Sequence, residues 1–279
     1  MIAIDTPIEQ YEGIWVKRED LACAPPGPPF SKIRGLEAKL FALTKIGTNA
    51  VGYMDTSVSM AGWGVSYFCQ QFNMTAVIFY PKYKDTAGRE NLEEHIQKWK
   101  EFGATVVPLD KPQRQKINWY RARKVLKEGW PNAFMLEQGF PYKESIEETA
   151  KQVHLIPKEL LGGSIVISIG SGVICSGVTR GLLELESDTK IYGITVSPKD
   201  LDGMEKKIRT RSNDVFGQVD LELINGGYEY TQTEDIETPF NCNKYYDAKA
   251  WAWLVRHQEE LKKPLIFWNI GGEGKNVRI

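Results

Sequence analysis

The sequence has few residues of the kinds that build metal centres or disulfide frameworks. Its 279 residues include only four cysteines and three histidines. They are scattered, with no C-x-x-C pair, so we expect neither a zinc site nor a disulfide scaffold, and no metal. The net charge of −1 excludes a broadly cationic nucleic-acid coat, although a local basic face stays open.

Long apolar runs and a basic leader are also missing. The longest weakly polar stretch, Ile165–Val178, is too short and too rich in glycine to span a bilayer. The first ten residues, MIAIDTPIEQ, carry two acids and lack the basic segment of a signal peptide. We therefore expect a cytoplasmic globular protein with no membrane partner.

Apolar runs alternate with amphipathic segments along most of the chain. Such alternation predicts a mainly parallel sheet with helices on both faces, and 279 residues are enough for about two α/β domains. The expected strands are Gly13–Val16, Ala50–Met54, Ala76–Tyr80, Thr105–Leu109, Ala133–Leu136, Ser164–Ile169, Ile191–Val196 and Leu265–Trp268. The expected helices are Leu36–Ile46, Gly64–Phe72, Glu90–Glu101, Gln115–Lys127, Ile146–Val153, Gly177–Leu185 and Ala248–Leu261.

Lys32 stands where a Pro/Gly-rich loop gives way to a predicted helix, with Ser31 as its expected N-cap. The positive end of a helix dipole lowers the pKa of an amine, which suits a lysine that attacks a carbonyl group. A solvated lysine at a helix start is the alternative interpretation.

The segment Ile169–Val178, IGSGVICSGV, follows an expected strand and leads into a helix. Gly170, Ser171 and Gly172 allow backbone N–H groups to approach a phosphate at the helix N-terminus. The spacing matches neither a Walker loop nor the G-x-G-x-x-G fingerprint. A glycine-rich turn without a ligand is the alternative.

Two further segments lie at expected helix starts. The turn Asp55–Gly64, DTSVSMAGWG, is rich in small and hydroxyl residues, so its N–H groups could meet a carboxylate. Helix capping by Ser57 or Ser59 explains the same composition equally well. Asp247 precedes a helix rich in Trp and Ala, and an N-cap role is its default interpretation.

Taken in order, these segments resemble the pyridoxal-phosphate (PLP) enzymes of fold type II, the tryptophan-synthase β family. Within it they look most like 1-aminocyclopropane-1-carboxylate deaminase and D-cysteine desulfhydrase. The resemblance rests on WVKRED at 15–20, SKIRGLE at 31–37, IGSGVICSGV at 169–178, KYYDAKA at 244–250 and LIFWNIGGEG at 265–274. It implies two three-layer α/β domains, a large PLP-binding domain of residues 1–46 and 143–279 and a small domain of residues 47–142.

The resemblance also assigns roles to individual residues. Lys32 would bind the cofactor covalently, Tyr246 would be the catalytic tyrosine, and Asp247 would face the pyridine nitrogen. Ser59 would be a catalytic residue in the turn that holds the substrate carboxylate. The cofactor phosphate would bind the loop Gly170, Ser171, Gly172, Val173, Ile174, Cys175 and Ser176.

Two positions depart from the family pattern. Met60 stands where the family has an asparagine beside the cofactor ring, and Ile270 replaces a threonine. The substrate-binding turn has therefore been rebuilt. An acid at Asp247 favours reactions through a carbanion at Cα over simple β-replacement. The resemblance thus implies a PLP-dependent lyase, of decarboxylase or deaminase type.

Two hypotheses about the reaction follow. In the first, the enzyme decarboxylates an amino acid attached to thymidine in phage DNA, as in base hypermodification. The basic stretches Arg114–Lys127 and Lys206–Arg211 are compatible with DNA, through a cleft lined by Arg121, Arg123 or Arg209, although solvated helix faces explain both stretches. In the second, the enzyme deaminates or desulfhydrates a small free amino acid.

The expected partners follow from these hypotheses. The substrate is of amino-acid type, carried on DNA under the first hypothesis, and the compartment is then the host cytoplasm. A homodimer stays open as the assembly state.

Overall fold

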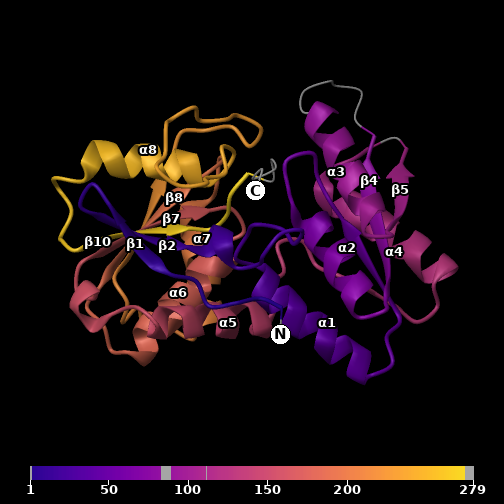
Figure 1. Ribbon diagram of the computed structural model, residues 1–279, viewed down its shortest axis with the longest axis horizontal. Helices are drawn as coiled ribbons and strands as arrows, with labels where there is room; N and C mark the ends of the chain where they lie inside the picture. Colours follow the sequence, from indigo (N-terminus) through magenta and orange to yellow (C-terminus); the bar gives the residue numbers. More distant parts are fainter. Residues whose placement is uncertain (1, 83–88, 111, 274–279) are drawn as a thin grey trace. The chain divides into compact units, whose positions relative to one another are not determined.

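The computed structural model describes residues 2–82, 89–110 and 112–273, with the side chains of 89 and 90 left out. The chain divides into two compact units, one of residues 1–35 and 141–279 and the other of residues 36–140 (Figure 1). These divisions fall after residues 35 and 140, whereas the resemblance implied boundaries after 46 and 142. Helix α1 (Ile33–Lys45) therefore begins in the first unit and continues into the second.

The first unit is built on a sheet with the strand order β1-β2-β10-β7-β8-β9. Only β1 is antiparallel to its neighbour; the other pairs are parallel. The strands are β1 (Ile8–Tyr11), β2 (Ile14–Arg18), β7 (Ser164–Ile169), β8 (Lys190–Thr195), β9 (Leu221–Asn225) and β10 (Leu265–Asn269). The carboxyl ends of β7, β8 and β10 meet at one edge, where parallel α/β sheets bind their ligands.

Helices cover both faces of this sheet (Figure 1). The helices are α5 (Lys143–His154), α6 (Val173–Glu184), α7 (Leu201–Ser212) and α8 (Asp247–His257), with short 3-10 turns at Glu19–Leu21 and Lys158–Leu160. Successive strand residues point to opposite faces. Ile165 and Ile167 accordingly join the core beneath α5, α6 and α7, whereas Val166 and Phe267 join the core beneath α8.

The second unit has a parallel sheet with the order β5-β4-β3-β6. Its strands are β3 (Ala50–Met54), β4 (Thr75–Pro81), β5 (Thr105–Leu109) and β6 (Ala133–Met135), and its helices are α2 (Ala61–Gln71), α3 (Arg89–Glu101) and α4 (Gln115–Gly129). Leu126 of α4 packs against Met54 and Phe79 of the sheet.

The α/β class expected from the sequence is confirmed. Three elements were not expected: β1, β9 and α7. Helix α7 has only Leu201, Met204 and Ile208 as apolar residues, too few for a clear helical stripe. Among the described residues, no helix is both long and apolar enough to cross a membrane.

Candidate active site

The segment that carries Lys32 is fixed on both sides. Before it, the N–H of Ser31 donates to the carbonyl of Ile270 at 2.8 Å. After it, Arg34 pairs with the buried carboxylate of Glu19. Ser31 does not cap α1 as expected: its buried hydroxyl has no hydrogen-bond partner among the described residues, and the helix begins two residues later, at Ile33.

The Lys32 ammonium donates to the hydroxyl of Ser171 at 3.2 Å. Burial, helped by the positive charge of Arg211 and opposed by Asp247, lowers its pKa to about 8. An amine with a lowered pKa is partly neutral near neutral pH, and the neutral form is the nucleophile.

The loop after β7 leaves helix amides open. Gly172 is the N-cap of α6 with φ +77°, and a Cβ there would lie 2.9 Å from Met204 Sδ, so only glycine fits. Having no side chain, Gly172 cannot accept from the first-turn N–H groups of α6. Such a helix start binds anions. The hydroxyl and the N–H of Ser176 both donate to the Gly172 carbonyl, at 2.8 Å and 2.9 Å, so both donors of Ser176 are already bonded within the helix.

Asp247 is fully buried at the start of α8. Its Oδ1 accepts from the Ser168 hydroxyl at 2.9 Å and the Ile270 N–H at 3.0 Å, and Oδ2 accepts from the Gly271 N–H at 3.1 Å. The default N-cap interpretation is wrong: Tyr246 holds the N-cap position, and the carboxylate bonds to β7 and to the segment after β10 instead. Burial raises its pKa to about 7, although the three donors favour the ionised form.

Tyr246 lies beside the glycine loop. A Cβ on Gly170 would meet its ring at 3.4 Å. Its hydroxyl lies 2.9 Å from the hydroxyl of Tyr230, which comes from the long loop after β9. Sequence reasoning missed Tyr230, because nothing in GGYEYTQ distinguishes it. It also missed Ser168, whose signal was a hydroxyl within the apolar strand SIVISI.

The remaining predicted site residue, Ser59, lies in the second unit. Its hydroxyl accepts from the N–H of Ala61 at 3.1 Å, and the buried carboxylate of Asp55 accepts from the N–H groups of Thr56 at 2.9 Å and Gly62 at 2.6 Å. Three of the amides expected to meet a ligand carboxylate, those of Thr56, Ala61 and Gly62, are therefore already bonded within the turn. Burial raises the pKa of Asp55 to about 7.

Comparison with known protein families identifies the chain. Residues 3–226 match the family described as pyridoxal-phosphate dependent enzyme. The chain belongs to this family. A protein of Pseudomonas phage M6, named glycyl-dTMP PLP-dependent decarboxylase, is 35% identical over 284 residues, covering 97% of this chain and 100% of the relative. A Thermotoga maritima protein, provisionally named 1-aminocyclopropane-1-carboxylate deaminase, is 23% identical and covers 93% of this chain and 88% of its own.

Solved structures share the fold of these PLP-dependent enzymes. The crystal structure of a 1-aminocyclopropane-1-carboxylate deaminase homologue has a TM-score of 0.80 at 20% identity, covering 98% of this chain and 91% of the other. A fungal L-serine ammonia-lyase from Rhizomucor miehei has a TM-score of 0.71 at 13% identity, covering 98% and 95%. At these identities the likeness concerns the fold alone.

The first unit fits PLP. Three features match three parts of the cofactor. The Lys32 amine suits its aldehyde, and the start of α6 suits its phosphate. The carboxylate of Asp247 suits a protonated pyridine nitrogen. Each carboxylate oxygen can accept about two hydrogen bonds, and Oδ2 of Asp247 receives one from the described residues. The family's cofactor therefore has complementary partners within residues 1–35 and 141–279.

The arginines expected to line a DNA cleft make contacts within the protein. Arg209 pairs with Glu205 at 2.7 Å and with Asp214 at 2.6 Å. Arg121 donates to the backbone carbonyl of Asp110 at 2.6 Å, and the Arg123 guanidinium lies 5.6 Å from the centre of the Trp119 ring. The buried carboxylate of Asp214 already neutralises Arg209, which leaves this arginine less available to a DNA phosphate.

Proposed function

We propose that this PLP-dependent enzyme removes the α-carboxylate of an amino acid attached to a thymidine nucleotide. The observation that carries the proposal is the 35% identity, over nearly the whole of both chains, to the phage protein named glycyl-dTMP PLP-dependent decarboxylase. A glycyl group on the nucleotide is accordingly the first substrate to test.

The residues of the first unit supply what this reaction needs. PLP, when bound, supplies a conjugated ring that accepts the electron pair released at Cα. Lys32 would bind the cofactor covalently and, once the amino group of the substrate has displaced it, would be available as an acid or base. Ionised Asp247 would hold the ring nitrogen protonated. The amides at the start of α6 would hold the phosphate.

Decarboxylation breaks the bond between Cα and the carboxylate carbon. Carbon dioxide leaves, the electron pair stays at Cα, and one proton must be added there to give the amine. We assign this proton to the Tyr246 hydroxyl, whose neighbour at 2.9 Å, Tyr230, can return a proton to it. Lys32 is the competing donor.

The turn in the second unit supports loss of the carboxylate over its retention. The resemblance assigns this turn to the substrate carboxylate. Here the N–H groups of Ala61 and Gly62 are bonded to Ser59 and Asp55, and the Asp55 carboxyl can itself carry a negative charge. The turn thus offers fewer donors to a carboxylate than the resemblance implies, which supports a reaction that does not require the carboxylate to be retained.

A second candidate is deamination of a small free amino acid. It is favoured by the Thermotoga maritima relative, with its provisional deaminase name and its match to 93% of this chain. The two candidates differ in the bond that breaks: carbon–carbon in the first and carbon–nitrogen in the second.

Product analysis distinguishes them. Purified holoenzyme is incubated with glycyl-dTMP labelled at the carboxyl carbon and, separately, with 1-aminocyclopropane-1-carboxylate and D-cysteine. We expect labelled carbon dioxide and the nucleotide amine from the first, with Lys32→Ala as the inactive control. Ammonia and a keto acid from the free amino acids, with no carbon dioxide from glycyl-dTMP, would refute the proposal.

A further inference from the structure

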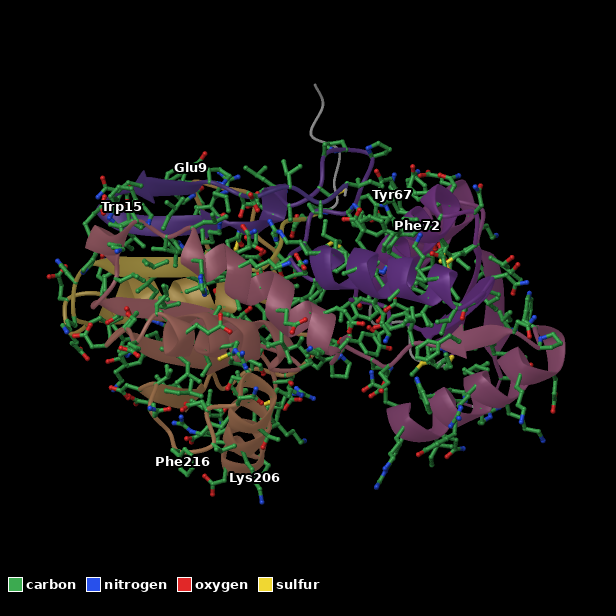
Figure 2. The ribbon with its side chains drawn as sticks, turned by 90° about the horizontal axis from the view of Figure 1, so that it is seen from below. Glu9, Trp15, Tyr67, Phe72, Lys206 and Phe216 are labelled. Atoms are coloured by element: carbon green, nitrogen blue, oxygen red, sulfur yellow. The ribbon has the colours of Figure 1, made fainter. Side chains whose placement is uncertain are left out.

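Lys249 is a lysine without access to solvent. Lysine side chains ordinarily extend into water, as that of Lys206 on α7 does (Figure 2). Lys249, in the first turn of α8, is 0% exposed. Burial lowers its pKa to about 8, although the charge of Glu234 acts in the opposite direction. An apolar side chain would avoid the cost of burying an ammonium, so the contacts of this ammonium must explain why a lysine stands here.

The ammonium joins two segments that are distant in sequence. It donates to the carbonyl of Val196, directly after β8, at 2.9 Å and to the carbonyl of Glu229 at 3.1 Å. It also lies 5.1 Å from the centre of the Tyr228 ring. Hydrogen bonds from a charged donor are stronger than those between neutral groups. Lys249 therefore attaches the segment that contains Tyr228 and Glu229 to the carboxyl end of β8 and to α8.

This segment belongs to the long loop between β9 and α8. Residues 226–246, all of them described, form neither helix nor strand, so no regular backbone ladder fixes them. The loop begins against β8, where the N–H of Gly226 donates to the hydroxyl of Thr195 at 3.2 Å. Three residues later, the Glu229 carbonyl accepts from Lys249 and also from the N–H of Gln232 at 3.2 Å. Lys249 is thus a contact that holds this part of the loop to the body of the unit.

Tyr230 directly follows Glu229, so its place depends on that of Glu229. The Glu229 carbonyl and the Tyr230 N–H belong to one planar peptide unit, and a bond to the carbonyl restricts both residues. The Tyr230 hydroxyl lies 2.9 Å from the hydroxyl of Tyr246, which is the N-cap of α8 and stands three residues before Lys249. The start of α8 therefore carries one tyrosine of the pair and, through Lys249, restrains the other.

We propose that Lys249 is a positioning residue, which holds Tyr230 where its hydroxyl can return a proton to Tyr246. The inference rests on the proposed function, in which Tyr246 adds the proton at Cα. Lys249 acts through the Glu229 carbonyl and needs no contact with the substrate. Displacement of a catalytic group by about 1 Å can cost about 100-fold in rate. Loss of the lysine should therefore slow the reaction with little effect on substrate binding.

The test is a double-mutant cycle combined with a measurement that needs no substrate. The variants are Lys249→Met, Tyr230→Phe and their combination, each loaded with PLP and supplied with glycyl-dTMP. Methionine is about as long as lysine but has no donor. The control, Leu160→Ala, removes buried methyl groups from the 3-10 turn before β7, at the opposite edge of the sheet. Amide hydrogen exchange of residues 226–236 is recorded for each protein without cofactor.

We expect Lys249→Met to lower kcat for amine formation on the order of 10- to 100-fold, with KM within about twofold of wild type. The double variant should be no slower than Tyr230→Phe alone, because Lys249 acts through Tyr230. Residues 226–236 should exchange faster in Lys249→Met but not in Leu160→Ala. If Lys249→Met does not fold, Lys249→Gln, which keeps a shorter donor, replaces it in the cycle.

Losses that add in the double variant would overturn the inference, because they would show a general structural role. Unchanged exchange of residues 226–236 in Lys249→Met would overturn it as well. Amine formed by Tyr230→Phe at the wild-type rate would also overturn it, while leaving decarboxylation intact. Absence of carbon dioxide from the wild-type enzyme would instead refute the proposed function, and hydrogen exchange would then decide alone whether Lys249 holds the loop.

Discussion

The buried carboxyl of Asp247 makes the stability of the cofactor-free protein depend on pH. Its folded-state pKa of about 7 lies above the ordinary value of 3.8, so the unfolded chain loses this proton first as pH rises. Stability from this group is fully present below pH 3.8 and is lost between there and pH 7. Asp247→Asn removes this dependence, because an amide does not ionise.

The magnitude follows from the two pKa values. At about 1.4 kcal/mol per pKa unit, a rise from 3.8 to about 7 corresponds to about 4 kcal/mol, of which about 3 kcal/mol falls between pH 5 and pH 8. The asparagine also destabilises the folded protein at every pH. Its NH2 group faces one of the donors from which Asp247 accepts, and this costs about 1–3 kcal/mol. We therefore expect the free energy of unfolding of the variant to increase relative to that of wild type as pH rises.

Urea denaturation of both cofactor-free proteins, at intervals from pH 5 to pH 8, measures this difference. Asp55 has a similarly raised pKa, but it is present in both proteins and cancels in the comparison. A difference in stability that stays constant with pH would show that the Asp247 carboxyl is not destabilised by burial. Adding PLP should reverse the trend in wild type only, because a protonated ring nitrogen stabilises the ionised carboxylate.

Three further predictions concern the residues around it. Lys32→Ala should abolish the visible absorbance of the bound cofactor, measured by spectrophotometry after dialysis; retention of the colour would mean that another lysine binds PLP. Gly172→Ala should destabilise the protein by about 1–2 kcal/mol in thermal unfolding and weaken PLP binding, since φ is +77° and Met204 leaves no room for a Cβ. An alanine variant of wild-type stability would refute this. Tyr246→Phe should keep cofactor binding but slow proton addition at Cα by 100-fold or more, on the order of general-acid contributions; unchanged kcat in a stopped-flow assay would assign the proton to Lys32.

The sequence predicted the elements with strong local patterns. Buried strands such as SIVISI at 164–169 are nearly continuous apolar runs. The glycine loop is recognisable from residues that permit close approach of the backbone. Lys32 became a candidate because it lies at an expected helix start, and the resemblance gave it the role of cofactor lysine. These features depend on a few consecutive residues, so they can be identified without the rest of the chain.

The features that were missed depend on distant partners. Asp247 looked like an N-cap because its donors, Ser168 and Gly271, lie 79 and 24 residues away. Ser59 looked available to a ligand because the carboxylate that occupies its turn, Asp55, could not be placed from spacing alone. Arg209 looked like a DNA contact because Asp214 is outside its helix.

The position of β10 has a consequence for how the protein forms. This strand follows β1 to β9 in sequence, yet it lies between β2 and β7 in the sheet. The segment after it also supplies the carbonyl that holds Ser31 and the amides that hold Asp247. During synthesis more than 200 further residues must therefore be added after the hairpin β1–β2 before its neighbour β10 exists. A ribosome-bound chain that lacks β10 has a divided sheet, and its Asp247 lacks two of its three donors, so we expect the complete cofactor site only in chains that include the segment after β10.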